Sequence, residues 1–135
     1  MSFVMDCSVT LSWYFSDELT ERSSALRERL ADEMIYVPAL WPLEITNALL
    51  AALRRGRISE SDLPPLLADL RELPDDVDRE TDSMVWDRSI RIAQEYDLTV
   101  YDATYLELAM RRDVPIATLD KALAKASKLA AVEVL

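Results

Sequence analysis

Short apolar segments alternate with longer stretches of helical periodicity along this chain. Three segments have the length and apolar content of buried strands: Ser2–Met5, Met34–Val37 and residues 114–118. Val77 marks a further short strand, and residues 132–135 could close the sheet. This alternation predicts an α/β/α sandwich around a mainly parallel sheet of about five strands with right-handed crossovers.

The helices are predicted from apolar periodicity and from the prolines and the single glycine. They are expected over residues 18–32, 42–55, 83–96 and 103–112. Pro42 opens the second of these, and Gly56 follows its end as a C-cap residue. A further helix within residues 59–73 should start near Asp62, because Pro64 and Pro65 fit only a first turn. No linker or repeat divides the chain, so residues 1–135 are predicted to form a single domain.

Composition removes most kinds of catalytic chemistry. The chain has no histidine and one cysteine, which excludes zinc fingers, Cys-His nucleophiles and Ser-His-Asp triads. Its single glycine excludes a glycine-rich loop that cradles phosphates. The remaining possibilities are catalysis by carboxylates and metal ions, or a protein that is not a catalyst.

Charge and hydropathy limit the surroundings of the protein. The formal net charge of −10 argues against non-specific coating of nucleic acid, although a bound metal ion would reverse the charge of an acidic pocket. The longest apolar run, residues 48–53, is far shorter than the ~20 residues that span a bilayer, so no membrane association is expected. The N-terminus does not fit a secretory signal, and Cys7 has no partner within the chain. A reduced, cytoplasmic protein is therefore predicted.

Four acidic residues stand where a strand is expected to end or a helix to begin: Asp6, Glu44, Asp102 and Asp120. Because the carboxyl ends of parallel strands share one edge of a sheet, these side chains are predicted to lie at the same rim. Ordinary structural roles also exist for them. Asp102 and Asp120 could be helix N-caps, and Glu44 could complement a helix dipole. Asp6 is harder to explain in this way, since a buried carboxylate is costly unless it is hydrogen-bonded or metal-bound.

Carboxylate oxygens suit hard cations, so the expected cofactor is Mg²⁺ or Mn²⁺. Such a site would favour hydrolysis of a phosphodiester by a water molecule that the cation activates, because the chain has no histidine to act as a base. One or two ions would serve this chemistry.

Four sequence motifs resemble one known family. They are VMDCS at 4–8, PALWPLEITNAL at 38–49, YDATYLELA at 101–109 and ATLD at 117–120. Their order and spacing are similar to the PIN domain and, within it, to the VapC-type ribonuclease toxins of bacterial toxin-antitoxin pairs. The similarity covers essentially the whole chain.

The resemblance implies that Asp6, Glu44, Asp102 and Asp120 are catalytic, metal-binding acids of an RNA-cleaving enzyme, with a tRNA or an rRNA as substrate. It places hydroxyls beside the acids at Ser8 and Thr118, where they would orient carboxylates or water, and a polar side chain at Asn47. It also implies a homodimer. A VapB-like antitoxin would inhibit it by laying a C-terminal segment, with a basic side chain, across the acidic groove.

Lysines are confined to the C-terminal end of the chain. Lys121, Lys125 and Lys128 are spaced so that they share one face of a helix just past Asp120. This basic stripe could bind RNA phosphates, or it could be a solvated helix face.

Two other functions compete with the ribonuclease. A receiver-like phosphorylation domain is also an acidic α/β fold, but it would need a second acid where Cys7 stands and a lysine at a strand end. A non-catalytic module could use the acidic groove to bind a basic peptide. Substitution of Asp6 or Asp102 by Asn would separate an enzyme from such a module.

Overall fold

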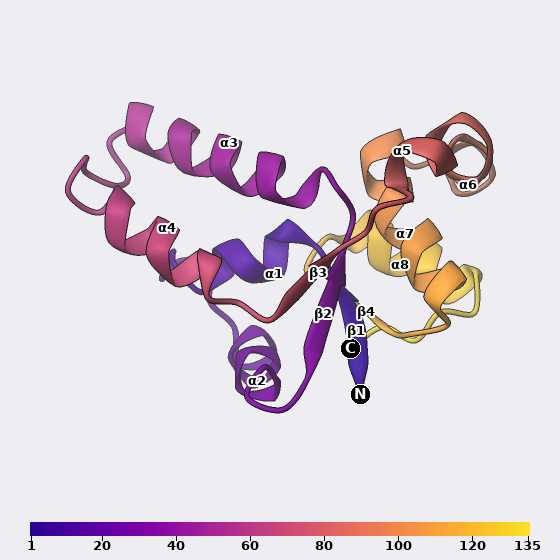
Figure 1. Ribbon diagram of the computed structural model, residues 1–135, viewed down its shortest axis with the longest axis horizontal. Helices are drawn as coiled ribbons and strands as arrows, with labels where there is room; N and C mark the ends of the chain where they lie inside the picture. The colour runs from indigo at the N-terminus through magenta and orange to yellow at the C-terminus, as the bar shows by residue number, and fades with distance from the viewer.

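The computed structural model describes residues 1–135 and has a central parallel sheet between two layers of helices (Figure 1). The sheet order is β3-β2-β1-β4. The strands are β1 (Ser2–Met5), β2 (Met34–Val37), β3 (Asp75–Val77) and β4 (Ile116–Ala117). In the register of the parallel pairs, Phe3 lies opposite Ile35 and Val4 opposite Ile116. The predicted fold class is confirmed.

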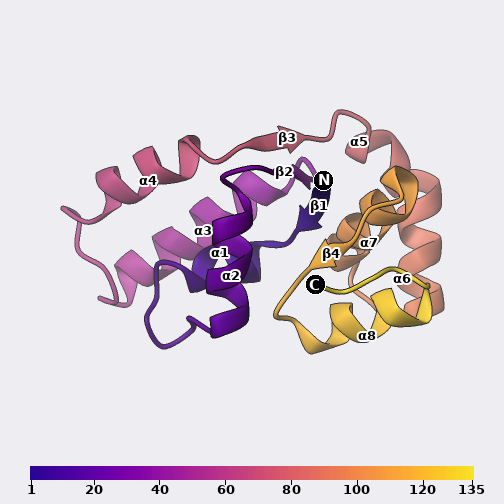
Figure 2. The same ribbon diagram turned by 90° about the horizontal axis from the view of Figure 1, so that it is seen from below.

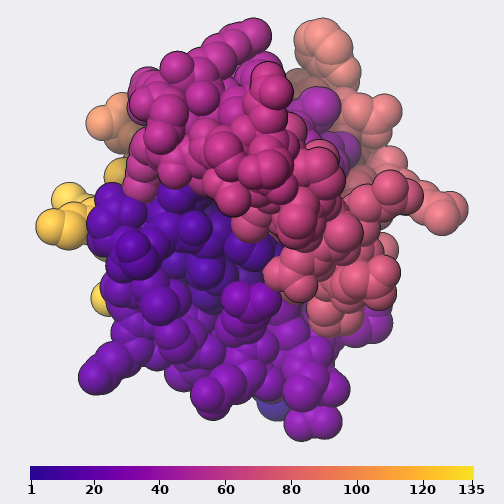
Figure 3. All heavy atoms as spheres, turned by 90° about the vertical axis from the view of Figure 1, so that its left-hand side faces the viewer, coloured from indigo at the N-terminus to yellow at the C-terminus, as the bar shows by residue number.

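The helices divide between the two faces of the sheet. They are α1 (Cys7–Ser12), α2 (Glu21–Arg29), α3 (Trp41–Arg54), α4 (Leu63–Arg71), α5 (Thr81–Met84), the π-helical turn η1 (Val85–Ser89), α6 (Ile90–Tyr96), α7 (Val100–Arg112) and α8 (Lys121–Leu129). Figures 1 and 2 show α1–α4 on one side and α5–α8 on the other. Figure 3 looks onto the first side, where most of the surface is coloured indigo to rose and so belongs to the chain from its N-terminus to just past its middle. No helix combines the length and the apolar character needed to cross a membrane.

The sheet has four strands, where about five were expected. The strands at Ser2–Met5 and Met34–Val37 and the short strand at Val77 are confirmed. Residues 114–118 contribute only the two residues of β4. Because β4 is so short, the segment 132–135 forms a single bridge, Ile116 with Val134, rather than a fifth strand.

Local signals explain where the helices begin and end. The α2 helix starts later than predicted, because Thr20 and Ser23 form a capping box at its start. Gly56 has a φ of 75° just past the end of α3, and the amides of Gly56 and Arg57 bond back to Leu53 and Ala52, so the predicted C-cap is confirmed. The α4 helix starts directly after Asp62, as predicted.

Two helical features were not predicted. The helix expected over residues 83–96 is a continuous run of α5, η1 and α6, so a π-helical turn interrupts it. The α1 helix was missed altogether. Its six residues are too few to show a clear period of 3.6, and it is stabilised by the side chain of Asp6, which accepts a hydrogen bond from the Ser8 amide at 2.9 Å.

The core is built around β1 and α7. Phe3, Val4 and Met5 are completely buried, because helices cover both faces of the central strand. In α7 every residue from Ala103 to Ala109 is buried, including Glu107. A helix enclosed on nearly all sides has a fixed position, so side chains at its N-terminal end are held firmly relative to the sheet.

Candidate functional site

The sheet order reverses at β1, which has β2 on one side and β4 on the other. From β1 the chain crosses to β2 on one side, whereas the crossover after β3 brings β4 to the other side of β1. Such a reversal opens a gap between helices where ligands bind in parallel α/β sheets. Asp6 follows β1 and Asp120 follows β4 through Thr118 and Leu119, so both acids come to this gap.

Asp6 is the most deeply buried of the four acids, with 4% of its surface exposed. Hydroxyl groups from two segments hold its carboxylate: Ser8 Oγ donates to Oδ1, and Thr118 Oγ1 donates to Oδ2 at 2.5 Å. Burial raises the pKa of Asp6, and the hydrogen bonds from Ser8 and Thr118 oppose that rise. The same two hydroxyls accept hydrogen bonds from the amides of Leu119 and Asp120, which fixes the loop after β4 against the start of α1.

Glu44 lies in the first turn of α3, half-buried at the same rim. Its Oε1 accepts a hydrogen bond of 2.6 Å from the hydroxyl of Tyr105 in α7. Burial is the main cause of its raised pKa, the hydrogen bond from Tyr105 lowers it, and the charge of Asp6 raises it further. The carboxylates of Glu44 and Asp6 are therefore close enough for their charges to interact.

Asp102 is the third residue of α7 and does not cap it. Thr99 is the N-cap, and its side chain accepts a hydrogen bond from the Asp102 amide at 3.1 Å, so α7 begins at Val100 rather than at Ala103. Burial, followed by the charges of Asp120, Asp6 and Glu44, raises the pKa of Asp102 to about 6. The negative charges of the other three acids therefore act on the carboxyl group of Asp102.

Asp120 is exposed and caps α8, where it accepts a hydrogen bond from the Leu123 amide at 2.9 Å. The capping role considered from the sequence is therefore present. The charge of Asp120 is close enough to Asp102 to raise the pKa of that residue.

The four acids share one rim, yet their oxygens do not converge. No three acidic or cysteine side chains are arranged so that they could coordinate one metal ion. Each of Asp6, Glu44 and Asp120 is instead drawn toward a hydrogen-bond donor of the protein. Like charges also repel one another when no cation compensates them. The donor set, all carboxylate oxygen, has the chemistry that hard divalent cations prefer.

The remaining predicted residues occupy the borders of this rim. Asn47 is exposed on α3, one turn past Glu44, and its side chain forms no hydrogen bond within the protein. Lys121, Lys125 and Lys128 are exposed on α8 and line one shallow depression, and none of them forms an ion pair. They begin directly after Asp120, beside the acidic rim.

Sequence reasoning missed two residues that contact the acids. Tyr105 lies at i+3 from Asp102, on the buried part of α7, but nothing in the sequence pairs it with Glu44, 61 positions away. Cys7 lies beside the acids as a free thiol. Burial and the charges of Glu44, Asp6 and Asp102 raise its pKa to about 12, which makes it unreactive as a nucleophile at neutral pH.

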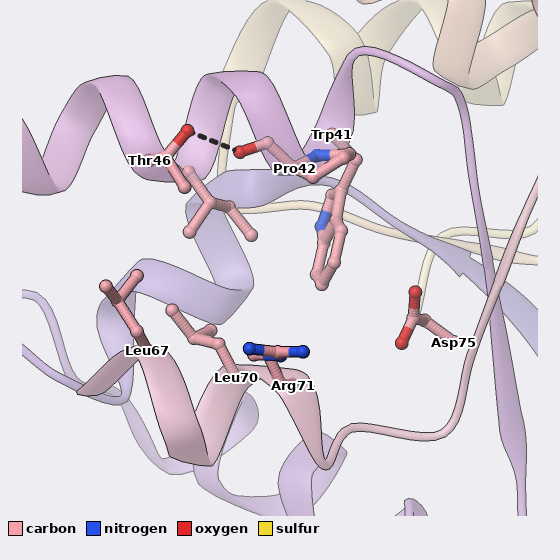
Figure 4. Close-up of a pocket in the computed structure, with 8 residues that line it drawn as sticks. Trp41, Pro42, Thr46, Leu67, Leu70, Arg71 and Asp75 are labelled. Atoms are coloured by element: carbon pink, nitrogen blue, oxygen red, sulfur yellow. Dashed lines mark hydrogen bonds between the residues drawn. The ribbon is translucent and has the colours of Figure 1, made fainter. Parts of the chain in front are cut away.

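A separate cavity of about 480 Å³ lies between α3 and α4 (Figure 4). Trp41 projects into it from the start of α3, and Arg71 and Asp75 lie at its opposite side. None of the four acids lines this cavity. This cavity is therefore separate from the rim that holds the four acids.

Comparisons with known proteins show the family of the chain and agree with its fold. A family model described as the PIN domain matches residues 3–129. Ribonuclease VapC3 from Pyrobaculum aerophilum is 26% identical over 125 residues, which cover 93% of this chain and 94% of that protein. The crystal structure of PAE2754 from Pyrobaculum aerophilum superposes with a TM-score of 0.67 at 22% identity, over 99% of this chain and 83% of that chain.

Proposed function

This chain belongs to the PIN-domain family, and from that premise we propose that it is a metal-dependent endoribonuclease, the toxin of a toxin-antitoxin pair. Its relative in Pyrobaculum aerophilum is named a ribonuclease. The observation that carries the proposal is the gathering of four carboxylates from separate segments at the carboxyl ends of β1 and β4. Burial, together with the charges of the other three acids, raises the pKa of Asp102 to about 6. The substrate class is structured RNA, a tRNA or an rRNA.

Mg²⁺ or Mn²⁺ fits this set of donors, and Asp6, Glu44, Asp102 and Asp120 would hold it. When bound, such a cation lowers the pKa of a water molecule and stabilises the charge of the leaving oxygen. Because no three of these acids converge in the present arrangement, binding would require some of their side chains to rotate toward a common point. The mutual repulsion of the carboxylates is the strain that a cation would relieve.

The protein side chains have distinct roles in this proposal. Ser8 and Thr118 keep Asp6 in a fixed orientation through their hydroxyl groups. Asn47 offers a free amide next to Glu44 for water or RNA. In the metal-free protein Asp102 takes up a proton near pH 6, so the acid cluster carries less charge below that pH.

The stripe of Lys121, Lys125 and Lys128 would bind RNA phosphates on the way to the acids. Since these lysines have no carboxylate partner in the protein, their charge is available to a polyanion. Their replacement by Ala should weaken RNA binding and flatten its dependence on salt, because fewer counterions are released.

The remaining parts of the proposal concern partners. A cognate antitoxin would place a basic side chain in the acidic rim and block it, consistent with the net charge of −10. We also propose a homodimer that acts in the cytoplasm. The receiver-like alternative has no support, because all three lysines lie on α8 rather than at a strand end.

A pair of substitutions on one helix tests the proposal. Asp102→Asn removes a carboxylate from the acidic rim, whereas Asp113→Asn makes the same chemical change at the opposite, exposed end of α7, where Asn tolerates the φ of 53°. With purified RNA and Mn²⁺, D102N should lose cleavage by at least about 100-fold, since groups that merely orient metal ligands are already worth 10–100-fold. D113N should cleave RNA like the unaltered protein.

Growth arrest upon overexpression gives the second readout, because it should disappear with D102N and persist with D113N. If D102N still arrests growth and folds normally, the acidic groove acts as a binding module and not as an enzyme. Failure of the unaltered protein to cleave any RNA with Mg²⁺ or Mn²⁺ would also refute the proposal.

A further inference from the structure

Tyr105 is a fully buried tyrosine whose only polar side-chain atom points at the acidic rim. Its side chain is 1% exposed and belongs to the core, in the middle of α7. Its hydroxyl donates to Glu44 Oε1 at 2.6 Å, across the gap between α7 and α3. Packing alone does not require this hydroxyl, because a phenylalanine would fill the same volume.

The position of Tyr105 on its helix links two of the acids. Asp102 and Tyr105 are three residues apart and therefore lie on the same side of α7. The helix thus supplies one acid itself and holds a second acid from α3. Since α7 is enclosed by the core from Ala103 to Ala109, this hydrogen bond ties Glu44 to a buried part of that helix.

Only one oxygen of Glu44 is used in this contact. Oε1 is held by Tyr105, while Oε2 forms no hydrogen bond within the protein. A carboxylate fixed through one oxygen has lost most of its rotational freedom, and its second oxygen remains available as a ligand.

We propose that Tyr105 is a positioning residue that holds Glu44 Oε1 and so presents Oε2 to the divalent cation of the acidic rim. This inference rests on the proposed function. Tyrosine suits the role because its hydroxyl is neutral and adds no charge to the site. Burial, and then the hydrogen bond to Glu44 and its charge, raise the pKa of Tyr105, so the hydroxyl stays a donor at every working pH.

The chain contains a matched control for this contact. The hydroxyl of Tyr14 also donates to a carboxylate at 2.6 Å, that of Asp69 on α4, away from the four acids. Tyr105→Phe and Tyr14→Phe therefore each remove one tyrosine–carboxylate hydrogen bond of equal length. Only the first removes a contact to a residue of the acidic rim.

Mn²⁺ binding to the metal-free, full-length protein is the direct readout, measured from the electron paramagnetic resonance signal of free Mn²⁺. Y105F should bind Mn²⁺ about tenfold more weakly, the loss typical when a group that orients a metal ligand is removed. Y14F should keep the Kd of the unaltered protein. In RNA cleavage, Y105F should need about tenfold more Mn²⁺ for half-maximal rate, while its KM for RNA at saturating Mn²⁺ stays the same.

Equal Kd values for Y105F and the unaltered protein would overturn this inference and leave the proposed function standing. Equal weakening in Y105F and Y14F would also overturn it, because the effect would then be a general loss of stability. If the unaltered protein bound no Mn²⁺, the proposed function would fall and this inference with it.

A measurement on the unaltered protein covers the case in which Y105F does not fold. With tyrosine labelled by ¹³C at the ring carbon that bears the hydroxyl, saturating Mg²⁺ should shift the resonance of Tyr105 and leave that of Tyr14 in place. The Tyr105 resonance is assigned by exclusion with Tyr→Phe variants of the other four tyrosines. A Tyr105 resonance that does not move while Mg²⁺ binds would contradict the proposed role.

Discussion

Among single residues, Asp6, Glu44 and Asp102 of the acidic rim are ionisable groups whose charged form is unfavourable in the folded protein. Burial and neighbouring carboxylates raise the pKa of Asp102 from 3.8 to about 6, and the pKa values of Asp6 and Glu44 are also raised. A raised carboxyl pKa means that the ionised form is less stable in the folded protein than in the unfolded chain. Functional sites commonly carry such a cost in stability.

Asp102→Asn should therefore stabilise the metal-free protein at neutral pH. Below about pH 4 Asp102 is protonated in both the folded and the unfolded states and has no effect, but between pH 4 and 6 only the folded state keeps the proton. The unaltered protein should lose stability as pH rises through this window, whereas D102N should not. At pH 7.5 the gain is expected to be about 1–2 kcal/mol, after discounting for solvent at this partly exposed group.

Thermal melts in EDTA from pH 4 to 8 measure this effect. The difference in Tm between D102N and the unaltered protein should grow between pH 4 and pH 6 and then level off. A constant difference over that range would show that folding does not raise the pKa of Asp102.

The hydroxyls around Asp6 allow a second prediction. Thr118 is 1% exposed, and its hydroxyl bonds to Asp6, so Thr118→Val should cost about 1.5–3 kcal/mol, the range for a hydrogen bond to a charged group. Thr10 is equally buried, but its hydroxyl has no partner, so Thr10→Val should be neutral or stabilising. Urea unfolding of both variants at pH 7.5 tests the contrast. An equal loss in T118V and T10V would contradict it.

At the scale of elements, a buried ion network connects the segment after β3 to α7. Arg111 of α7 bonds to Asp78 at 3.0 and 2.6 Å, to Glu107 at 2.8 and 3.1 Å, and to Glu80 at 2.9 Å. Asp78 and Glu107 are 4% and 1% exposed. Thr81, which bonds to Asp78, also accepts a hydrogen bond from the Ala39 amide just before α3. The network therefore joins the two helices that carry Asp102 and Glu44.

Loss of the guanidinium should be severe. Arg111→Met leaves two buried carboxylates without a partner and is expected to cost about 3–5 kcal/mol. Arg91 provides the control, because its ion pair with Asp87 at 2.8 Å is exposed, with 77% and 62% of the side chains accessible. Arg91→Met should change stability by less than about 1 kcal/mol. The midpoints of denaturant unfolding of the two variants test this prediction. Similar midpoints would show that the buried network has little effect on stability.

At the scale of the whole molecule, net charge and fold have separate consequences. The resemblance to the PIN domain is confirmed by the match over residues 3–129, and the expected α/β/α class by the parallel sheet between two helical layers. The net charge of −10 has no part in choosing the fold, but it produces repulsion across the compact state.

Salt should therefore stabilise this protein. Raising NaCl from about 50 to 500 mM shortens the Debye length from roughly 14 to 4 Å, so repulsion between surface carboxylates is screened and Tm should rise by several degrees. Mg²⁺ at the same ionic strength should raise Tm further, because it also binds the acidic rim. If NaCl and MgCl₂ at matched ionic strength gave the same Tm, specific binding would be contradicted. A Tm that falls with NaCl would contradict the screening argument.

Features that depend on near neighbours along the chain could be predicted from the residues alone. Apolar runs located β1 and β2 to the residue, prolines and Gly56 located the ends of α3 and α4, and parallel topology predicted that four acids at segment ends share a rim. These signals are local, because hydrophobic period and capping act within a few residues. The short α1 was missed, since six residues show no clear period, and the strand predicted over residues 114–118 is only two residues long.

The hydrogen bonds that hold the acids could not be predicted, because they join segments that are far apart in the chain. Thr118 reaches Asp6 across 112 positions, and Tyr105 reaches Glu44 across 61, through contacts that depend on how strands and helices pack. The raised pKa of Asp102 likewise depends on three charges from other segments. Packing brings groups that are far apart in the chain close enough for hydrogen bonds and Coulomb interactions. The local pattern of residues gives no information on how close two such groups come in the folded protein.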